Sequence, residues 1–238
     1  MNLSDPLGLI IRLFNAIKLI DIDNSSPVVI YSSFLPIFKA LKAADSKIVD
    51  QFLELLINHY SNRGILMPSF TKGYNKENIC DLDREKSNNG VLSDSFRKNN
   101  KVIRTLSAYF SYLYLGPCEK EMFDLSPEYA WGMNSVLDWI QENDATIIMI
   151  GLHPTQNSFP HRIEWLLKDS IPYRENIIKK GIVIRKQKRY SLSEKLFVRK
   201  KNILNLENDF TKIFNVLDRD KVRCKNIDGI LLSSYKSS

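Results

Sequence analysis

Short apolar runs, each followed by a polar segment, set the pattern of this chain. The runs at residues 27–31, 64–71 and 146–150 are nearly continuous and end in hydroxyl-bearing or imidazole-bearing residues. Runs of this length are typical of strands buried on both faces. The segment 45–59 carries apolar residues three and four positions apart, which predicts a helix. A strand, loop and helix unit is therefore expected near the start of the chain.

Weaker patterns extend this alternation along the whole chain. They predict further strands at 107–115, 181–185 and 230–234, helices at 7–20, 135–141, 162–168 and 209–217, and an irregular stretch at 72–89. Alternating strands and helices indicate an α/β fold. A chain of 238 residues can bury roughly 70–75% of its unfolded surface, so a single domain over 1–238 is expected.

Two observations bear on the compartment. The cysteines Cys80, Cys118 and Cys224 are odd in number and widely spaced, which argues against a disulfide framework and predicts a cytoplasmic protein. The first helix is amphipathic and no small-residue cleavage site follows it. No apolar run approaches the roughly 20 residues that span a bilayer, so no membrane association is expected.

The loop after residues 146–150 is the first place to expect chemistry. It holds two of the three histidines, His153 and His161, and Glu164 lies three residues past His161. If a helix starts near Pro160, imidazole and carboxylate share one face. His161 is then a candidate proton acceptor that Glu164 or another carboxylate orients. An isolated histidine that merely caps or packs a helix is the alternative.

Metal binding is not predicted for this loop. His153 and His161 lie eight residues apart with no cysteine nearby, whereas zinc ligands are usually more closely paired. In open α/β sheets, ligands bind where the loops at strand ends converge. The site is therefore expected among the loops after Tyr31, Met67 and Ile150.

The charge balance favours anions. The chain has 34 basic and 27 acidic residues, a net charge of +7, with basic clusters at 179–180, 185–189 and 199–201. These clusters are compatible with a solvated face, the phosphates of a cofactor, a nucleotide-linked substrate or nucleic acid. No zinc-finger or RNP-type motif accompanies them, so no nucleic-acid partner is predicted.

A series of short motifs runs in a fixed order along nearly the whole chain. They are Tyr-Ser-Ser-Phe at 31–34, Met-Pro-Ser-Phe at 67–70, a Gly-x-x-Ser-x-x-Phe-Arg segment at 90–97, residues 104–111 before Gly-Pro at 116–117, Ser-Pro at 126–127, Gly151 with Asn-Ser-Phe-Pro-His-Arg-Ile-Glu at 157–164, and Asp-Phe at 209–210. In this order they resemble the motifs of the aminoglycoside 3-N-acetyltransferase family, also called the antibiotic N-acetyltransferase family. No single motif is specific, but their succession is.

The resemblance implies a three-layer α/β/α sandwich, distinct from the commoner GNAT acetyltransferase fold. It implies transfer of an acetyl group from acetyl-CoA directly to an amine on a sugar, with no metal. His161 would be the general base, oriented by Asp209 or Glu164. By the same resemblance the cofactor-binding residues are Ser32, Ser33, Phe34, Arg97, Arg104, Thr105, Ser107 and Ser111. The substrate would meet Asn157, Ser158 and Phe70.

The net charge of the chain restricts which acceptor substrates are expected. Aminoglycosides are polycations, which need acidic surroundings, and this chain is basic. We therefore expect a small-molecule acceptor that is an anionic or nucleotide-linked amino sugar. Two alternatives stay open: a catalytically degenerate family member that serves as a CoA-binding or assembly protein, and a basic nucleic-acid-binding protein. The sequence does not indicate an oligomeric state.

Overall fold

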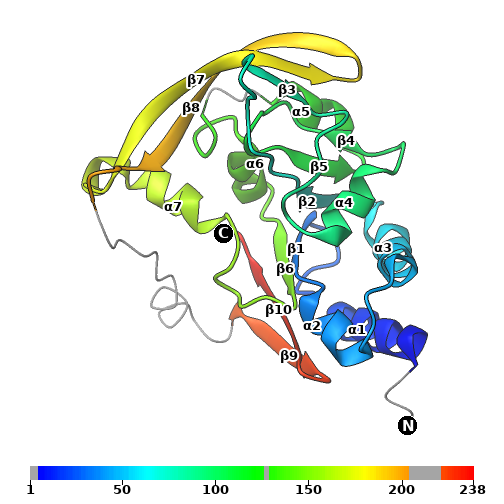
Figure 1. Ribbon diagram of the computed structural model, residues 1–238. Helices are drawn as coiled ribbons and strands as arrows, with labels where there is room; N and C mark the ends of the chain where they lie inside the picture. Colours follow the sequence, from blue (N-terminus) through cyan, green and yellow to red (C-terminus); the bar gives the residue numbers. More distant parts are fainter. Residues whose placement is uncertain (1–4, 126–128, 204–220) are drawn as a thin grey trace.

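The predicted apolar runs form the centre of a seven-stranded sheet in the computed structural model, which describes residues 5–125, 129–203 and 221–238 (Figure 1). The strand order is β4-β5-β2-β1-β6-β10-β9. The strands are β1 (Val28–Ser32), β2 (Ile65–Pro68), β4 (Ile103–Arg104), β5 (Tyr112–Leu115), β6 (Thr146–Ile150), β9 (Arg223–Ile227) and β10 (Ile230–Lys236). β1 lies parallel to both β2 and β6, and the outer strands pair antiparallel. The carboxyl ends of β1, β2 and β6 therefore meet at one edge.

Helices cover both faces of this sheet. One face packs against α1 (Pro6–Ile20), α2 (Leu35–Leu41), α3 (Ser46–Tyr60) and α4 (Val91–Arg97). The other packs against α5 (Glu119–Asp124), α6 (Val136–Glu142) and the segment of α7 (Pro160–Leu166), which a 3-10 turn (Lys168–Ser170) follows. Along β1, Val28 and Ile30 enter the first core and Val29 and Tyr31 the second, as the two-residue period of a strand requires. The α/β/α architecture expected from the sequence is confirmed.

A second sheet folds from the basic part of the chain. It joins β3 (Ile79–Asp81), β7 (Arg174–Arg185) and β8 (Lys188–Arg199), and the long β7–β8 hairpin arches over one end of the molecule (Figure 1). At the hairpin tip, Lys186 and Gln187 have φ of 49° and 61°. Their amides each donate to the Asp83 carboxylate at 2.8 Å. The basic clusters thus lie in the two hairpin strands, at their turn and just after β8, and the strand predicted at 181–185 is only the end of β7.

Most predicted elements are confirmed within one or two residues, and some of the others differ because of specific tertiary contacts. The strand predicted at 107–115 is wrong over its first half, because Ser107 Oγ and the Ala108 amide donate to the buried Glu194 carboxylate instead of to a neighbouring strand. The strand at 64–71 ends at Pro68. The helix predicted at 209–217 lies outside the described residues. Within the described part of the chain, no helix combines the length and apolar character of a membrane span.

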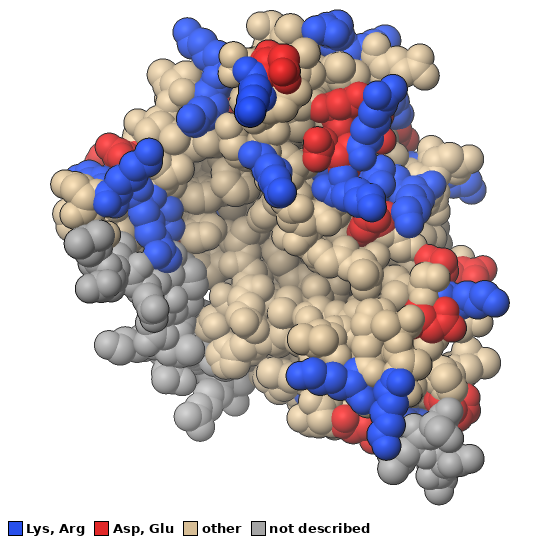
Figure 2. Space-filling model, viewed as in Figure 1, with Lys and Arg blue, Asp and Glu red and all other residues tan. Residues whose placement is uncertain are grey.

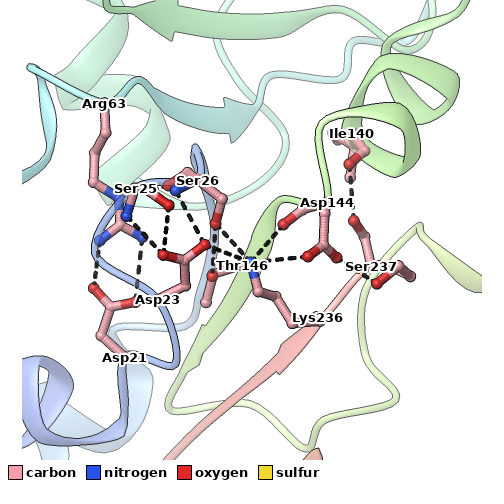
Figure 3. A network of polar contacts seen from close by, with 11 residues as sticks. Asp21, Asp23, Ser25, Ser26, Arg63, Ile140, Asp144, Thr146, Lys236 and Ser237 are labelled. Atoms are coloured by element: carbon pink, nitrogen blue, oxygen red, sulfur yellow. Dashed lines mark hydrogen bonds and ion pairs between the residues drawn. The ribbon is translucent and has the colours of Figure 1, made fainter.

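A polar cluster joins the sheet at the edge opposite the converging loops (Figure 3). Lys236 Nζ, at the end of β10, donates to Asp23 Oδ2 at 2.9 Å, to Ser26 Oγ at 2.8 Å and to the Asp144 carbonyl at 2.8 Å. Arg63 beside it binds the Asp21 carboxylate at 2.9 Å. One ammonium group thereby connects the last strand to the segments that enter β1 and β6.

Replacing Lys236 with methionine is expected to lower the free energy of unfolding by about 2 kcal/mol, since hydrogen bonds to a charged group are lost. The hydrogen bonds from Lys236 and Ser25 hold the pKa of Asp23 far below its usual range. A lowered folded-state pKa adds stability that is complete above the unfolded value of about 4 and is lost as the pH falls from there toward the folded pKa. The difference between the two proteins in urea titrations should therefore shrink below about pH 4; a pH-independent difference would contradict this assignment.

Candidate active site

The loops that follow β1 and β6 approach each other closely at the carboxyl edge. The Ser33 amide donates to the Ile150 carbonyl at 2.8 Å. Gly151 has φ of +66°, and a Cβ there would lie 2.4 Å from the Ser33 carbonyl oxygen. Only glycine accommodates both that backbone conformation and that distance. The loops after β1 and β6 thus converge, as expected from the strand ends. The loop that leads to His161 lies against the segment carrying Ser32 and Ser33.

His161 and Glu164 form a hydrogen-bonded pair on α7. Pro160 occupies the first turn of this helix, so the three-residue spacing places both side chains on one face. His161 Nδ1 lies 2.5 Å from Glu164 Oε2. The imidazole is 24% exposed and the carboxylate only 7%. The carboxylate therefore fixes the ring from the buried side while the imidazole reaches the surface of a pocket.

Two residues where the chain enters β7 hydrogen-bond the Glu164 carboxylate. Arg174 Nη2, at the start of β7, donates to Glu164 Oε2 at 2.7 Å, and the Tyr173 hydroxyl donates to Oε1 at 2.9 Å. Burial alone would raise the pKa of Glu164, but the hydrogen bonds from His161 and Arg174 outweigh it and hold the pKa below its usual value. Glu164 is consequently a carboxylate, able to accept the proton on Nδ1.

Aromatic side chains pack under the His161 imidazole. The Trp131 ring stacks on His161 with centroids 4.4 Å apart and an interplanar angle of 16°. Phe110 lies 5.3 Å from Trp131, and the Arg174 guanidinium lies 5.2 Å from the same indole. The ring of His161 is therefore held by stacking as well as by the carboxylate, which restricts its rotation.

His161 opens onto a pocket that continues into a groove. The pocket, of about 360 Å³, is lined by Tyr31, Phe70, Asn89, Phe110, Gln156, Asn157, Ser158 and His161. A neighbouring cavity of about 500 Å³ shares Tyr31, Asn89 and Gln156 with it. A third, of about 650 Å³, shares Asn88, Gly90 and Val91 with the second and reaches Lys86 and Lys98. Figure 2 shows a hollow beside α7 on this face.

Three hydroxyl groups meet at the inner wall of the pocket. The Ser158 hydroxyl lies 2.7 Å from that of Tyr31 and 2.6 Å from that of Tyr112, and the two phenols are 3.0 Å apart. All three residues are buried. Burial raises the pKa of both tyrosines, so both stay protonated hydrogen-bond donors.

Several predicted residues come together here. Ser32, Ser33 and Phe34 line the groove, and Asn157, Ser158 and Phe70 line the His161 pocket. Asn157 also orders its own loop, since its side-chain nitrogen donates to the Pro154 carbonyl at 2.7 Å. Their roles toward cofactor and substrate stay predictions, but their grouping fits those roles.

Other predicted cofactor residues contact protein groups instead. Arg104 is buried and donates to the Ser111 hydroxyl and to the carbonyls of Leu82, Glu85 and Ser69 at 2.6–3.0 Å. The remaining predicted cofactor residues also contact protein groups. Arg97 pairs with Asp94, Thr105 Oγ1 accepts from the Tyr112 amide, and Ser107 Oγ donates to the Glu194 carboxylate. This geometry supports a structural role for them; cofactor contact stays a prediction.

Asp209, the other predicted orienting carboxylate, lies outside the described residues. His153 is exposed on its loop, with Nδ1 2.8 Å from Thr155 Oγ1. Among residues 5–125, 129–203 and 221–238, no three His, Cys, Asp or Glu side chains are grouped as a metal site would need.

Sequence reasoning missed several residues of this site, among them Trp131, Arg174, Tyr31 and Tyr112. Tyr31 had a signal, since it ends a buried strand beside the Ser-Ser loop. Trp131, Arg174 and Tyr112 join the site only through tertiary packing, and nothing in their local sequence distinguishes them.

Comparisons with known proteins agree with this fold. A model of the aminoglycoside 3-N-acetyltransferase family matches residues 53–230. The fold is similar to AAC-IIIb in its binary complex with CoASH (TM-score 0.76, 14% identity, 96% of this chain and 91% of that one). It is also similar to AAC(3)-Xa (0.77, 11%, 98% and 93%) and to AAC-VIa bound to sisomicin (0.75, 14%, 96% and 92%).

A search of curated proteins found no match to this sequence. At identities this low, the solved structures establish the fold alone. The family match is the stronger finding because it covers about three quarters of the chain, including the His161–Glu164 pair. The chain therefore belongs to the aminoglycoside 3-N-acetyltransferase family, and its class is that of N-acetyltransferases.

Proposed function

We propose that this protein transfers the acetyl group of acetyl-CoA directly to the amine of an anionic amino sugar, with His161 as general base. The observation that carries the proposal is the His161–Glu164 pair, because it faces a pocket that continues into a long groove. A groove suits an extended donor, and a base at its end suits an acceptor that must lose a proton.

The chemistry requires such a base. An alkylammonium group with a pKa near ~10 has almost no free lone pair at neutral pH, so its proton must leave before or during attack on the thioester. With Nδ1 held by Glu164, Nε2 is the nitrogen that takes this proton. The carboxylate then stabilises the imidazolium, and the imidazolium returns the proton to the departing thiolate sulfur.

The groove offers a path for the donor. Its walls include the Ser32 and Ser33 loop on one side and Gly90 and Val91 on the other. Both serines can hydrogen-bond the amides of a pantetheine arm. Lys86 and Lys98 line the far end together with Asp50 and Asp94, and Lys98 pairs with Asp94 at 3.8 Å. The two ammonium groups would contact the nucleotide phosphates.

Val91→Trp is expected to weaken acetyl-CoA binding at least tenfold without unfolding the protein. Val91 is 46% exposed and lines both cavities of the groove, so an indole there fills space that the donor needs. Isothermal titration with acetyl-CoA measures the effect, and Leu19→Trp, on an exposed position of α1, is the matched control. Equal affinity of Val91→Trp and wild type would place the donor elsewhere.

Charge supports an anionic acceptor. Among the described residues that line the His161 pocket, none is Asp or Glu, and Glu164 behind it is already paired with Arg174. Lys and Arg side chains border the hollow on this face (Figure 2). With a net charge of +7, such surroundings attract an anion and disfavour a polycation.

The acceptor proposal is tested by comparing kcat/KM for nucleotide-linked amino sugars with that for aminoglycosides at low salt. We expect the nucleotide-linked compounds to be the better substrates, with an advantage that falls as salt rises. An aminoglycoside that exceeds every nucleotide-linked amino sugar overturns the proposal for the acceptor. Tight acetyl-CoA binding without turnover of any amine would instead favour a degenerate, CoA-binding member of the family.

A further inference from the structure

The hydroxyl groups of Tyr31, Tyr112 and Ser158 form a hydrogen-bonded triangle. It is assembled from three separate parts of the chain: β1, β5 and the loop before α7. Two of its members, Tyr31 and Ser158, line the same pocket as His161. A cluster of buried hydroxyls in an otherwise apolar core is costly unless each proton has an acceptor.

The distances in the triangle favour one arrangement of its hydroxyl protons. The two contacts to the Ser158 oxygen, at 2.6 and 2.7 Å, are shorter than the 3.0 Å contact between the two phenols. This pattern fits both tyrosines donating to Ser158. The serine then accepts two hydrogen bonds and keeps its own proton, which points away from the tyrosines, on the side where Ser158 meets the pocket.

We propose that this proton of Ser158 is donated to the thioester oxygen of bound acetyl-CoA, and that it stabilises the oxyanion when the amine attacks. The inference rests on the proposed function and adds a catalytic residue to it. Tyr31 and Tyr112 are positioning residues: by donating to the serine oxygen they orient the hydroxyl and polarise it, since hydrogen bonds in a chain strengthen one another in a low-dielectric site.

The placement fits the reaction. The His161 amide donates to the Ser158 carbonyl at 3.1 Å, so serine and base lie one helical turn apart on the same pocket. As the amine nitrogen bonds to the thioester carbon, the carbonyl π electrons move to oxygen, where Ser158 meets them. When the oxyanion collapses, the carbon–sulfur bond breaks and the CoA thiolate leaves with its electron pair. The amine proton passes through His161 to that sulfur.

The first test needs no knowledge of the acceptor. Acetyl-CoA labelled with ¹³C at the thioester carbonyl is bound to wild type and to Ser158→Ala, and the carbonyl stretch is recorded by infrared difference spectroscopy. A donated hydrogen bond lowers the stretching frequency, so we expect a lower frequency in wild type than in Ser158→Ala. Tyr112→Phe should lie between them, because it removes only the polarising donor. Ser233→Ala, which loses another buried hydroxyl, on β10, should match wild type.

Kinetics with an accepted amine provide the second test. Loss of one oxyanion donor costs about 10²- to 10³-fold in kcat, and Ser158→Ala should lose that much with little change in the KM for acetyl-CoA. Tyr112→Phe keeps the side-chain shape and separates loss of the hydrogen bond from loss of packing.

The outcomes separate this inference from the function beneath it. If folded wild type does not bind acetyl-CoA, the proposed function fails. If it binds but Ser158→Ala and Tyr112→Phe leave the carbonyl frequency and kcat unchanged, the proposed function stands and the role of Ser158 is overturned.

Discussion

Replacing His161 with alanine is expected to lower kcat for acetyl transfer by about 10²- to 10⁴-fold, the usual contribution of a positioned general base. Acetyl-CoA affinity should change little, since the groove proposed for the donor begins beyond the imidazole. The residual rate should rise with pH, because an amine that loses its proton to bulk water needs no base. Wild type and variant should therefore converge toward pH 10.

The control for this prediction is His153→Ala, on the exposed part of the same loop, which should keep wild-type kcat. Stopped assays of CoA release over pH 6–10 measure both variants. If His161→Ala and wild type show parallel pH profiles, the imidazole takes no proton from the acceptor, and the His161–Glu164 pair has only a structural role.

Local sequence was sufficient to predict the pair itself. The distance from His161 to Glu164 along the chain is three residues, and Pro160 begins the helix that turns this spacing into a contact. The same applies to β6, where five consecutive residues, four of them apolar, are buried. Such features depend only on near neighbours, which a pattern can show.

What surrounds the pair depends on contacts far apart in the chain and could not be predicted. Arg174 lies outside the basic clusters at 179–180, 185–189 and 199–201 and is marked by no motif, yet its side chain is only 4% exposed. Arg104 resembled a phosphate ligand, but its guanidinium donates hydrogen bonds to carbonyl groups of a loop about twenty residues earlier in the chain. The sequence pattern does not show whether an arginine is buried or exposed. It also does not show which partner stabilises a buried arginine.

Replacing Arg174 with methionine is expected to lower the free energy of unfolding by about 3–5 kcal/mol, because one partner of a buried ion pair is left without its counter-charge. Arg174 and Glu164 side chains are 4% and 7% exposed. Methionine preserves packing against Trp131 and Phe197, so most of the loss comes from the carboxylate that stays behind. Urea unfolding at pH 7 measures the loss.

The carboxylate is identified as the cause by two further comparisons. Because the pKa of Glu164 is lowered in the folded protein, its ionised form stabilises above an ordinary pKa of about 4.3 and not below it. The penalty of Arg174→Met should therefore shrink toward pH 4, where the orphaned carboxylate takes up a proton.

The double variant Arg174→Met, Glu164→Gln should be more stable than Arg174→Met alone, since the amide carries no charge to leave unpaired. Arg162→Met provides the matched control, because Arg162 pairs with Asp138 on the other side of α7 at similar burial. It should destabilise comparably yet gain nothing from Glu164→Gln. If the two changes at Arg174 and Glu164 are simply additive, the guanidinium does not offset the charge of Glu164, and another group must hold the orienting carboxylate ionised beside the base.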